Sequence, residues 1–292
     1  MLVEYKKLLK NKNFYLVFFT LVLIVIIAAF TGVYTHKEEY QLIQKIYEKD
    51  ENVLSLVSPH KQWVGFSGAS NLASSLYYFI FPALISIALV DSIFRERISG
   101  NQNYMFLRMS RKKYYTVKFV TTYITAFLFF VLPLFLGIVL VNLLTNQWDY
   151  TTYATSYKSL VEGTIILPDN VFAGDIKVLF SDLLIMSPYV YIAFYYVLGG
   201  LFASGYICMG LALSMFIKNH YLVIFMPQII YIACWGLLTV LGKPQWDPFN
   251  LINPRQSLEQ LSITAIVVTL LLQHFIAFVI YSMGMRRNRD VL

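Results

Sequence analysis

Six long apolar runs constrain the fold of this chain more than any other feature of its sequence. A helix needs about 20 apolar residues to cross the hydrocarbon core of a bilayer. No segment between the runs is long enough to build a core of its own. The sequence therefore predicts an all-α integral membrane protein, with one domain over residues 1–292 and six transmembrane helices. The runs are Phe14–Tyr34, Leu72–Val90, Val117–Leu144, Ser187–Ile217, Leu222–Leu241 and Ile263–Met283.

The composition also favours a chain embedded in lipid. Of its 292 residues, 58% are hydrophobic and only 13% are charged, which is about half the charged share of a soluble domain. Cys208 and Cys234 both fall inside apolar runs, which favours packing over a disulfide framework or a metal cluster. The first run follows four lysines, as in a signal peptide, but it is long enough to span and no A-x-A cleavage site follows it. We interpret it as an uncleaved first span.

The distribution of charge predicts the orientation. With the N-terminus inside, the inner segments hold 15 of the 23 Lys and Arg residues and four of the 16 acids, whereas the outer segments hold the other eight basic residues and 12 acids. Because Lys and Arg concentrate in cytoplasmic loops, both termini are predicted to be cytosolic. This orientation accounts for the net charge of +7 without a nucleic-acid partner.

The segments outside the runs are predicted to lie at the membrane surfaces. Residues 1–13 have apolar and basic residues on opposite helical faces, which predicts an interfacial helix. The outer segment 35–71 is predicted to hold a separate short amphipathic helix around 42–47. The outer segment 145–186 is rich in Trp and Tyr, which concentrate at the headgroup level. The outer segment 242–262 contains three prolines, so we expect two short pieces, broken near Pro248 and Pro254.

Two further patterns concern the packing of the spans. Pro82, Pro133 and Pro227 lie inside runs, where each removes a backbone hydrogen bond that neighbouring helices must replace. In the fourth run, Gly199 and Gly200 begin small-x-x-x-small spacings, which allow two helix backbones to approach closely. This close contact could be made within the protein or with a second subunit.

The sequence carries no motif for catalysis, so the chain is not expected to be an enzyme. It has no phosphate-binding loop, no H-E-x-x-H and no G-x-S-x-G, and no Asp or Glu falls within a run. We expect no cofactor or metal in this chain. Gln228, Gln273 and His274 are the polar groups at membrane depth, and they are candidates to line a translocation path. The alternative is that they only bond neighbouring helices.

The linker 91–116, between the second and third runs, is the densest cluster of positive charge. Asp91–Ile98 can extend the second helix, Gly100 ends it, and Asn101 can cap a new short helix. On that helix Gln102, Met105, Phe106 and Met109 share one face. These residues either bury against the protein's own helices or enter a groove on a partner.

Residues of this linker resemble a motif of the ABC-2 type transporter permeases, in which an acidic residue precedes Gly-Thr, a short helix, Pro-x-Ser-Arg and a Lys at the start of the third span. Glu96, Gly100, Ser110, Arg111 and Lys118 match this pattern. The chain departs from it at the Thr position, which is Asn101, and at the Pro position, which is Met109. The order of spans and surface segments is also similar over nearly the whole chain.

The resemblance implies the membrane subunit of a bacterial ABC exporter in the cytoplasmic membrane. Its expected partners are a dimer of separate ATPase subunits, which would bind ATP and Mg²⁺, a second permease half that is identical or homologous, and membrane lipid. The largely apolar spans suggest an amphipathic or hydrophobic cargo, such as a peptide, bacteriocin, drug or lipid-like molecule. The residues expected to couple the two subunits are Glu96, Arg97, Gly100, Asn101, Met105, Phe106, Met109 and Arg111.

Two other functions remain open at this point. A carrier or channel that works without an ATPase would need charged or repeated polar groups at membrane depth, which the runs lack. A peptide immunity or sensor subunit would instead bind its ligand with the outer segments.

Overall fold

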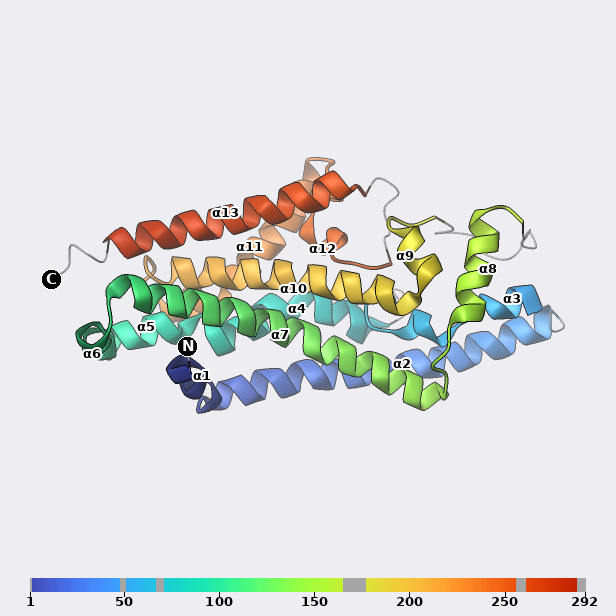
Figure 1. Cartoon of the computed structure of the whole chain (residues 1–292), viewed down its shortest axis with the longest axis horizontal. Coiled ribbons are helices and arrows are strands. Elements are labelled where there is room, and N and C mark those ends of the chain that lie inside the picture. The colour runs from blue at the N-terminus through green and yellow to red at the C-terminus, as the bar shows by residue number, and fades with distance from the viewer. Residues whose placement is uncertain (1, 48–50, 67–70, 165–176, 256–260, 288–292) are drawn as a thin grey trace.

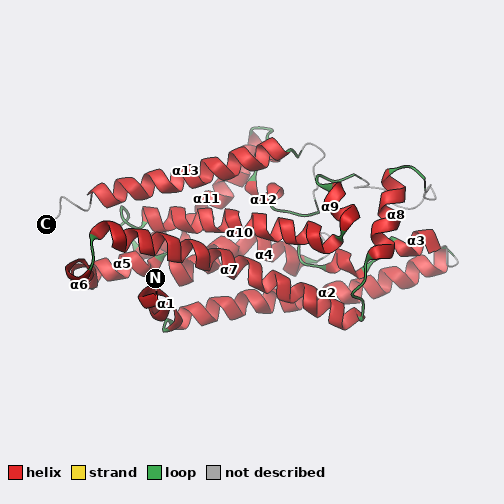
Figure 2. Ribbon diagram, viewed as in Figure 1, coloured by secondary structure: helices red, strands yellow, loops and turns green. Residues whose placement is uncertain are grey.

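The structure of the chain is a computed structural model that describes residues 2–47, 51–66, 71–164, 177–255 and 261–287. In these ranges all regular structure is helical (Figure 2). The elements are α1 (Leu2–Leu9), α2 (Lys12–Ile46), α3 (Glu51–Ser55), η1 (Pro59–Gln62), α4 (Leu72–Leu89), α5 (Asp91–Ile98), α6 (Asn101–Arg108), α7 (Arg111–Thr145), α8 (Thr151–Val161), α9 (Ser181–Met186), α10 (Pro188–Leu213), α11 (His220–Val240), η2 (Pro244–Trp246), α12 (Pro248–Leu251) and α13 (Ile263–Arg287).

Six helices of the described chain are long and apolar enough to cross a membrane, as the sequence predicts. They are α2, the continuous pair α4–α5, α7, α10, α11 and α13. The protein is therefore a multi-pass helical membrane protein. The expected helix within 1–13 is present as α1, and the expected short pieces in 242–262 are η2 and α12.

Helix α10 lies at the centre of the bundle, where it packs against α7, α13, α11 and α4 (Figure 1). In its most apolar stretch 83% of the residues are buried, compared with 17% in that of α11 and 22% in that of α13. Helix α2 covers α4 and α7 on the other side. Helices α11 and α13 therefore have the least buried apolar stretches of the six spans, and these surfaces are available to lipid or to another membrane subunit.

The two ends of the bundle differ (Figure 1). At one end, here called the terminal end, lie α1, α5, α6 and the C-terminal end of α13. At the other end, here called the distal end, lie α3, α8 and α9, next to the last turns of α2. Both ends of the described chain thus lie on the same side of the bundle, as an even number of spans requires.

The prediction of a separate amphipathic helix around 42–47 is wrong. The first span does not stop at Tyr34 but continues as one helix to Ile46, a length of about 52 Å. No Gly or Pro interrupts residues 35–46, and most of them are good helix formers. Hydropathy marks where the lipid-facing stretch ends, whereas the helix itself continues beyond the membrane surface.

The small residues of α10 make close contacts within the protein. A Cβ atom on Gly199 would lie 2.5 Å from the Phe130 ring of α7, and one on Gly200 would lie 2.7 Å from Val131 of α7. On other faces of α10, Gly205 meets Gln273 of α13 and Gly210 meets Pro227 of α11. These contacts account for the small-residue pattern without a second subunit.

The backbone near Pro133 accepts a hydrogen bond from a side chain of another span, as expected for a proline within a membrane helix. Pro133 has no N–H and crowds the preceding turn of α7. The hydroxyl of Tyr77, on α4, donates to the Phe130 carbonyl at 2.6 Å. Tyr77 is fully buried, so this bond fixes α4 against α7 in the interior of the bundle.

Candidate functional site

Helices α5 and α6 are joined by a tight turn at Gly100. This residue has φ 71°, in the left-handed region that favours glycine, and its N–H donates to the Arg97 carbonyl at 3.3 Å. Gly100, not Asn101, occupies the N-cap position of α6, and Asn101 is the first helical residue. Glycine takes this position because one residue must both end α5 and redirect the chain.

One face of α6 packs against the protein's own helices. Gln102 is buried and donates to the Tyr115 hydroxyl at 2.6 Å. Met105, Phe106 and Met109 pack against a buried cluster that includes residues of α7, α10 and α13. Of the two alternatives for this apolar face, the structure therefore shows burial within the chain, and Met105 and Phe106 are half-buried before any partner binds.

The opposite face of α6 carries exposed apolar side chains. Leu107 is 85% exposed and Tyr104 is 69% exposed, and Ile98 at the end of α5 is 70% exposed. We call these three residues the exposed apolar face. Helix α6 lies across the terminal end of the bundle, beyond the long helices (Figure 1). The helical spacing that identified the inner face in the sequence did not identify the exposed apolar face, although Tyr104 and Leu107 are also three residues apart.

Four charged residues tie α1 to this region, and we call them the terminal charge cluster: Glu4, Lys7, Glu96 and Lys118. The Lys118 amino group lies 2.7 Å from the Glu4 carboxylate and 2.9 Å from that of Glu96. Lys7 lies 3.1 Å from Glu4 and 3.0 Å from Glu96. The Tyr114 hydroxyl also donates to Glu96. Glu96, chosen from sequence as a coupling residue, thus connects α1, α5 and α7.

The electrostatics at Lys7 and Glu96 favour the charged forms of these two groups. Burial alone would lower the pKa of Lys7, but its hydrogen bond to Glu96 and the negative charges of Glu96 and Glu4 raise the pKa overall. The cluster borders a cleft of about 200 Å³ between α1, the α4–α5 helix and α7. Acids and bases are balanced in that cleft, so it presents no strong preference for an anion or a cation.

Arg97 and Asp91 connect α5 to the turn between α10 and α11. The Arg97 guanidinium donates to the carbonyls of Met215 at 2.9 Å and Ile217 at 3.2 Å, in the turn that follows α10. The His220 imidazole lies 2.9 Å from the Asp91 carboxylate. A movement of α5 and α6 would therefore reach both the first helix and the fourth and fifth spans.

Arg111 is the first residue of α7, and its guanidinium lies 5.1 Å from the centre of the Phe106 ring on α6. The structure brings the predicted linker residues together at the terminal end. It does not bring Gln228, Gln273 or His274 to them, because these three lie along α11 and α13 within the bundle.

The Gln228 side chain hydrogen-bonds the backbone of α4 next to Pro82. Pro82 has no N–H, so the Tyr78 carbonyl four residues earlier has no helical donor, and the Tyr231 hydroxyl of α11 donates to it at 3.0 Å. One residue further on, the Gln228 amide accepts from Ala83 N–H at 3.1 Å and donates to the Phe79 carbonyl at 3.0 Å. Gln228 and Tyr231 together attach α11 to the proline turn of α4.

Substitution of Gln228 by leucine is expected to destabilise the protein by about 1–3 kcal/mol, because it removes both side-chain bonds to the backbone of α4, at the Ala83 N–H and the Phe79 carbonyl. The change is measured as the midpoint of thermal unfolding in detergent. The Tyr231→Phe variant, which removes one bond, is expected to lose less. An unchanged midpoint in Gln228→Leu would show that α4 satisfies these groups by itself.

Gln273 and His274 also bond neighbouring groups. The Gln273 amide donates to the Phe202 carbonyl of α10 at 3.0 Å. His274 Nδ1 lies 2.9 Å from the Leu270 carbonyl, an acceptor, and Nε2 lies 3.1 Å from the Tyr123 hydroxyl. Because a carbonyl can only accept, Nδ1 is the donor in the bond to Leu270. Both side chains therefore connect α13 to α10 or α7.

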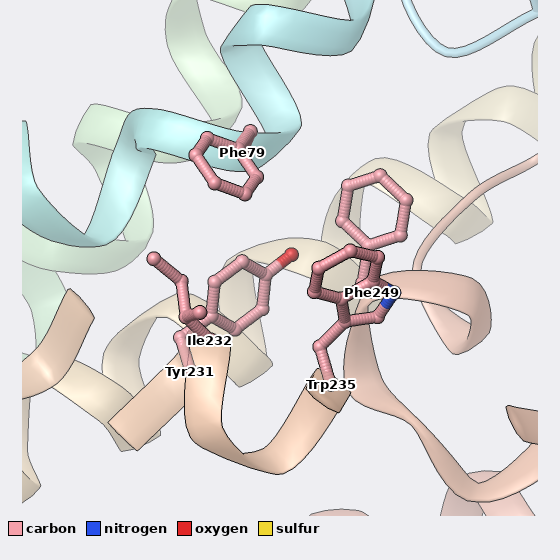
Figure 3. A pocket seen from close by; sticks show the side chains of 5 residues that line it. All are labelled: Phe79, Tyr231, Ile232, Trp235 and Phe249. Carbon is pink, nitrogen blue, oxygen red and sulfur yellow. The ribbon is translucent and has the colours of Figure 1, made fainter. Parts of the chain in front are cut away.

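An apolar pocket of about 70 Å³ lies next to the bonds that attach α11 to α4 (Figure 3). The Phe79, Tyr231, Trp235 and Phe249 rings surround it, together with Ile232. Phe79 is 41% exposed and Trp235 is 43% exposed, so the pocket opens toward the surface of the bundle. Such a site suits a small apolar group, such as part of an acyl chain or an aromatic side chain.

Behind this pocket, Asp247 caps the short helix α12, which supplies Phe249. Its carboxylate accepts from the Phe249 N–H and from the Asn250 side-chain amide, both at 3.3 Å. Burial raises the pKa of Asp247 to about 6. The carboxyl group therefore begins to take up a proton just below neutral pH.

Comparisons with known proteins add no identification. No protein-family model, no curated protein and no solved structure matches the chain.

Proposed function

We propose that this chain is the membrane subunit of an ATP-driven exporter of the ABC-2 permease type. The terminal end would face the cytosol of a bacterial cell, and separate ATPase subunits would bind ATP and Mg²⁺ there. A second permease half, identical or homologous, would complete the transporter. This chain would contribute no catalytic group of its own.

The observation that carries the proposal is that α6 has one face packed against the bundle and one exposed apolar face. Its inner face is held by α7, α10 and α13, and its outer face presents Tyr104 and Leu107 to solvent or a partner. Exposed apolar residues on a short transverse helix at the end of a membrane bundle are suited to a groove on another protein. Nearby basic residues, which can meet acidic groups on that partner, are Arg108, Lys112 and Lys113.

The contacts of α5 supply a route for transmitting movement. A force on α6 would act on α1 through Glu96 and on the α10–α11 turn through Arg97. From α11, the bonds of Gln228 and Tyr231 continue to α4 and to the walls of the aromatic pocket. ATP can drive such a change only if the ATPase contacts differ between its two states.

The pocket and the apolar spans favour an amphipathic or hydrophobic cargo. The pocket would take an apolar part of that cargo from the membrane, because its lining consists of four aromatic rings and one isoleucine. The polar part of the cargo would remain at the membrane surface.

The test is recovery of an ATPase with the full-length chain after purification from its own membranes. Leu107→Asp is expected to reduce the recovered ATPase at least about tenfold, because a buried charge at the centre of an interface costs about 2 kcal/mol or more. Leu42→Asp is the matched control, since Leu42 is also an exposed leucine (58%) but lies toward the distal end of α2. Transport activity of the purified chain without any nucleotide-hydrolysing subunit would refute the proposal.

A further inference from the structure

The distal end holds a histidine that the transport proposal does not use. His60 lies in η1 and is fully buried. Its ring centre is 4.1 Å from that of Tyr153, 5.4 Å from Phe66, 5.6 Å from Tyr150 and 5.7 Å from Trp63. Two of these rings follow η1 in the chain, and the other two come from the beginning of α8, so the imidazole fills the contact between the two elements.

Neither ring nitrogen of His60 has a hydrogen-bond partner among the described residues. A neutral imidazole has one donor and one acceptor, whereas an imidazolium has two donors and a positive charge. An aromatic enclosure without an acceptor disfavours the charged form strongly. Burial accordingly holds the pKa of His60 well below its usual range, and the positive charges of Lys61 and His36 act in the same direction.

Among the residues that the structure describes, the charged groups that shift the pKa of His60 are Lys61 and His36, and both are basic. Lys61 is its neighbour on η1, with its amino group 5.8 Å from the centre of the Tyr153 ring. The charge of His36, on α2, also acts on it. Burial raises the pKa of Tyr150 and of Tyr153, so both phenols stay neutral.

Asp149, the acid next to Tyr150 in sequence, accepts hydrogen bonds from Thr151. The Asp149 carboxylate accepts from the Thr151 N–H at 2.9 Å and from the Thr151 hydroxyl at 3.2 Å, at the beginning of α8. It therefore bonds the first residue of α8, and it makes no hydrogen bond to His60.

Polar contacts hold the elements around His60 in place. The buried Asn142 of α7 accepts from the Trp63 indole at 3.1 Å and from the Tyr150 hydroxyl at 2.6 Å. The hydroxyls of Ser55 on α3 and Ser156 on α8 lie 2.7 Å apart. These contacts favour the closed arrangement, so the ring can reach water only if η1 and α8 separate.

We propose that His60 makes the packing of η1 against α8 sensitive to acid, so that proton binding to the imidazole favours an open distal end. The direction of this pH effect on the stability of the closed form follows from proton linkage. The open form binds the proton more readily than the closed form, so the closed form keeps its full stability above pH of about 6.5 and loses stability as the pH falls below that value. The ratio of open to closed molecules rises at most about tenfold for each pH unit of that decrease.

The experiment is hydrogen exchange of the full-length chain in lipid nanodiscs at pH 7.5, 6.5 and 5.5, corrected for the intrinsic pH dependence of exchange. We expect peptides covering η1 and α8 to lose protection up to about tenfold between pH 6.5 and 5.5. Protection of α10, at the bundle centre, should stay constant. In His60→Phe and His60→Gln, which cannot titrate, the loss at η1 and α8 should disappear.

His36→Gln is the matched control, because it removes the other histidine of this end and should leave the pH response in place. The use of two His60 variants separates titration from packing, since phenylalanine retains the aromatic contacts and glutamine retains a polar group. The proposal is overturned if wild-type protection does not change with pH, or if either well-folded His60 variant retains the response. A response that disappears in His36→Gln would assign it to His36 instead.

Discussion

Replacement of Lys118 by methionine is expected to destabilise the protein by about 3 kcal/mol and to weaken the attachment of α1 and α5 to α7. The Lys118 side chain is 5% exposed and pairs with two carboxylates that are themselves mostly buried, those of Glu4 and Glu96. Removing one member of a buried ionic group leaves uncompensated charge and costs about 3–5 kcal/mol. Lys7 still contacts both acids, which places the expected loss at the lower end of that range.

The loss is measured as the midpoint of thermal unfolding in detergent, with ATPase recovery as a second readout. Lys112→Met makes the same replacement at an exposed position on the same helix, and it should leave the midpoint unchanged. If Lys118→Met and Lys112→Met behave alike, the terminal charge cluster does not stabilise the fold.

Replacement of Gly199 by leucine is expected to destabilise the bundle by about 3 kcal/mol, near the upper end of the usual cost of overpacking. The new Cβ would lie 2.5 Å from the Phe130 ring, closer than two carbon atoms can approach. Phe130 is fully buried, and the rings of Tyr77, Tyr78 and Phe81 surround it, so it has little room to move.

Gly236→Leu on α11 is the matched control, because a Cβ there would meet nothing within 4 Å. It should be neutral or slightly stabilising, since leucine favours helix more than glycine does. The comparison uses thermal unfolding and size-exclusion chromatography in detergent. Equal stability of the two variants would contradict the close packing of α10 against α7.

Local patterns in the sequence predicted several features of the terminal end correctly. The six spans follow from run length, and the break at Gly100 follows from the need for a left-handed residue between two helices. A short helix after Gly100 follows from apolar spacing, whereas the sequence left open whether its apolar face packs within the protein or against a partner. Each of these features depends on residues within a few turns of one another, so the local chain contains the required information.

The sequence did not reveal which groups satisfy the polar residues within the bundle. Gln228 looked like a candidate for a translocation path, but its amide bonds the backbone of α4, 145 residues earlier in the chain at Ala83. Glu96 meets Lys7 across 89 residues and Lys118 across 22. Pairings over such separations depend on how whole helices pack, and no local periodicity encodes them.

By itself, the sequence determined that this protein is a helical membrane protein with six spans, because lipid requires long apolar helices whatever their arrangement. Only the tertiary structure decided that Tyr104 and Leu107 remain exposed while Met105 and Phe106 are covered. It also decided that His60 lies among four aromatic rings, with no hydrogen-bond partner in the part of the chain that the structure describes. Exposure and hydrogen bonding depend on the neighbours that other helices bring, and these neighbours are fixed only when the bundle assembles.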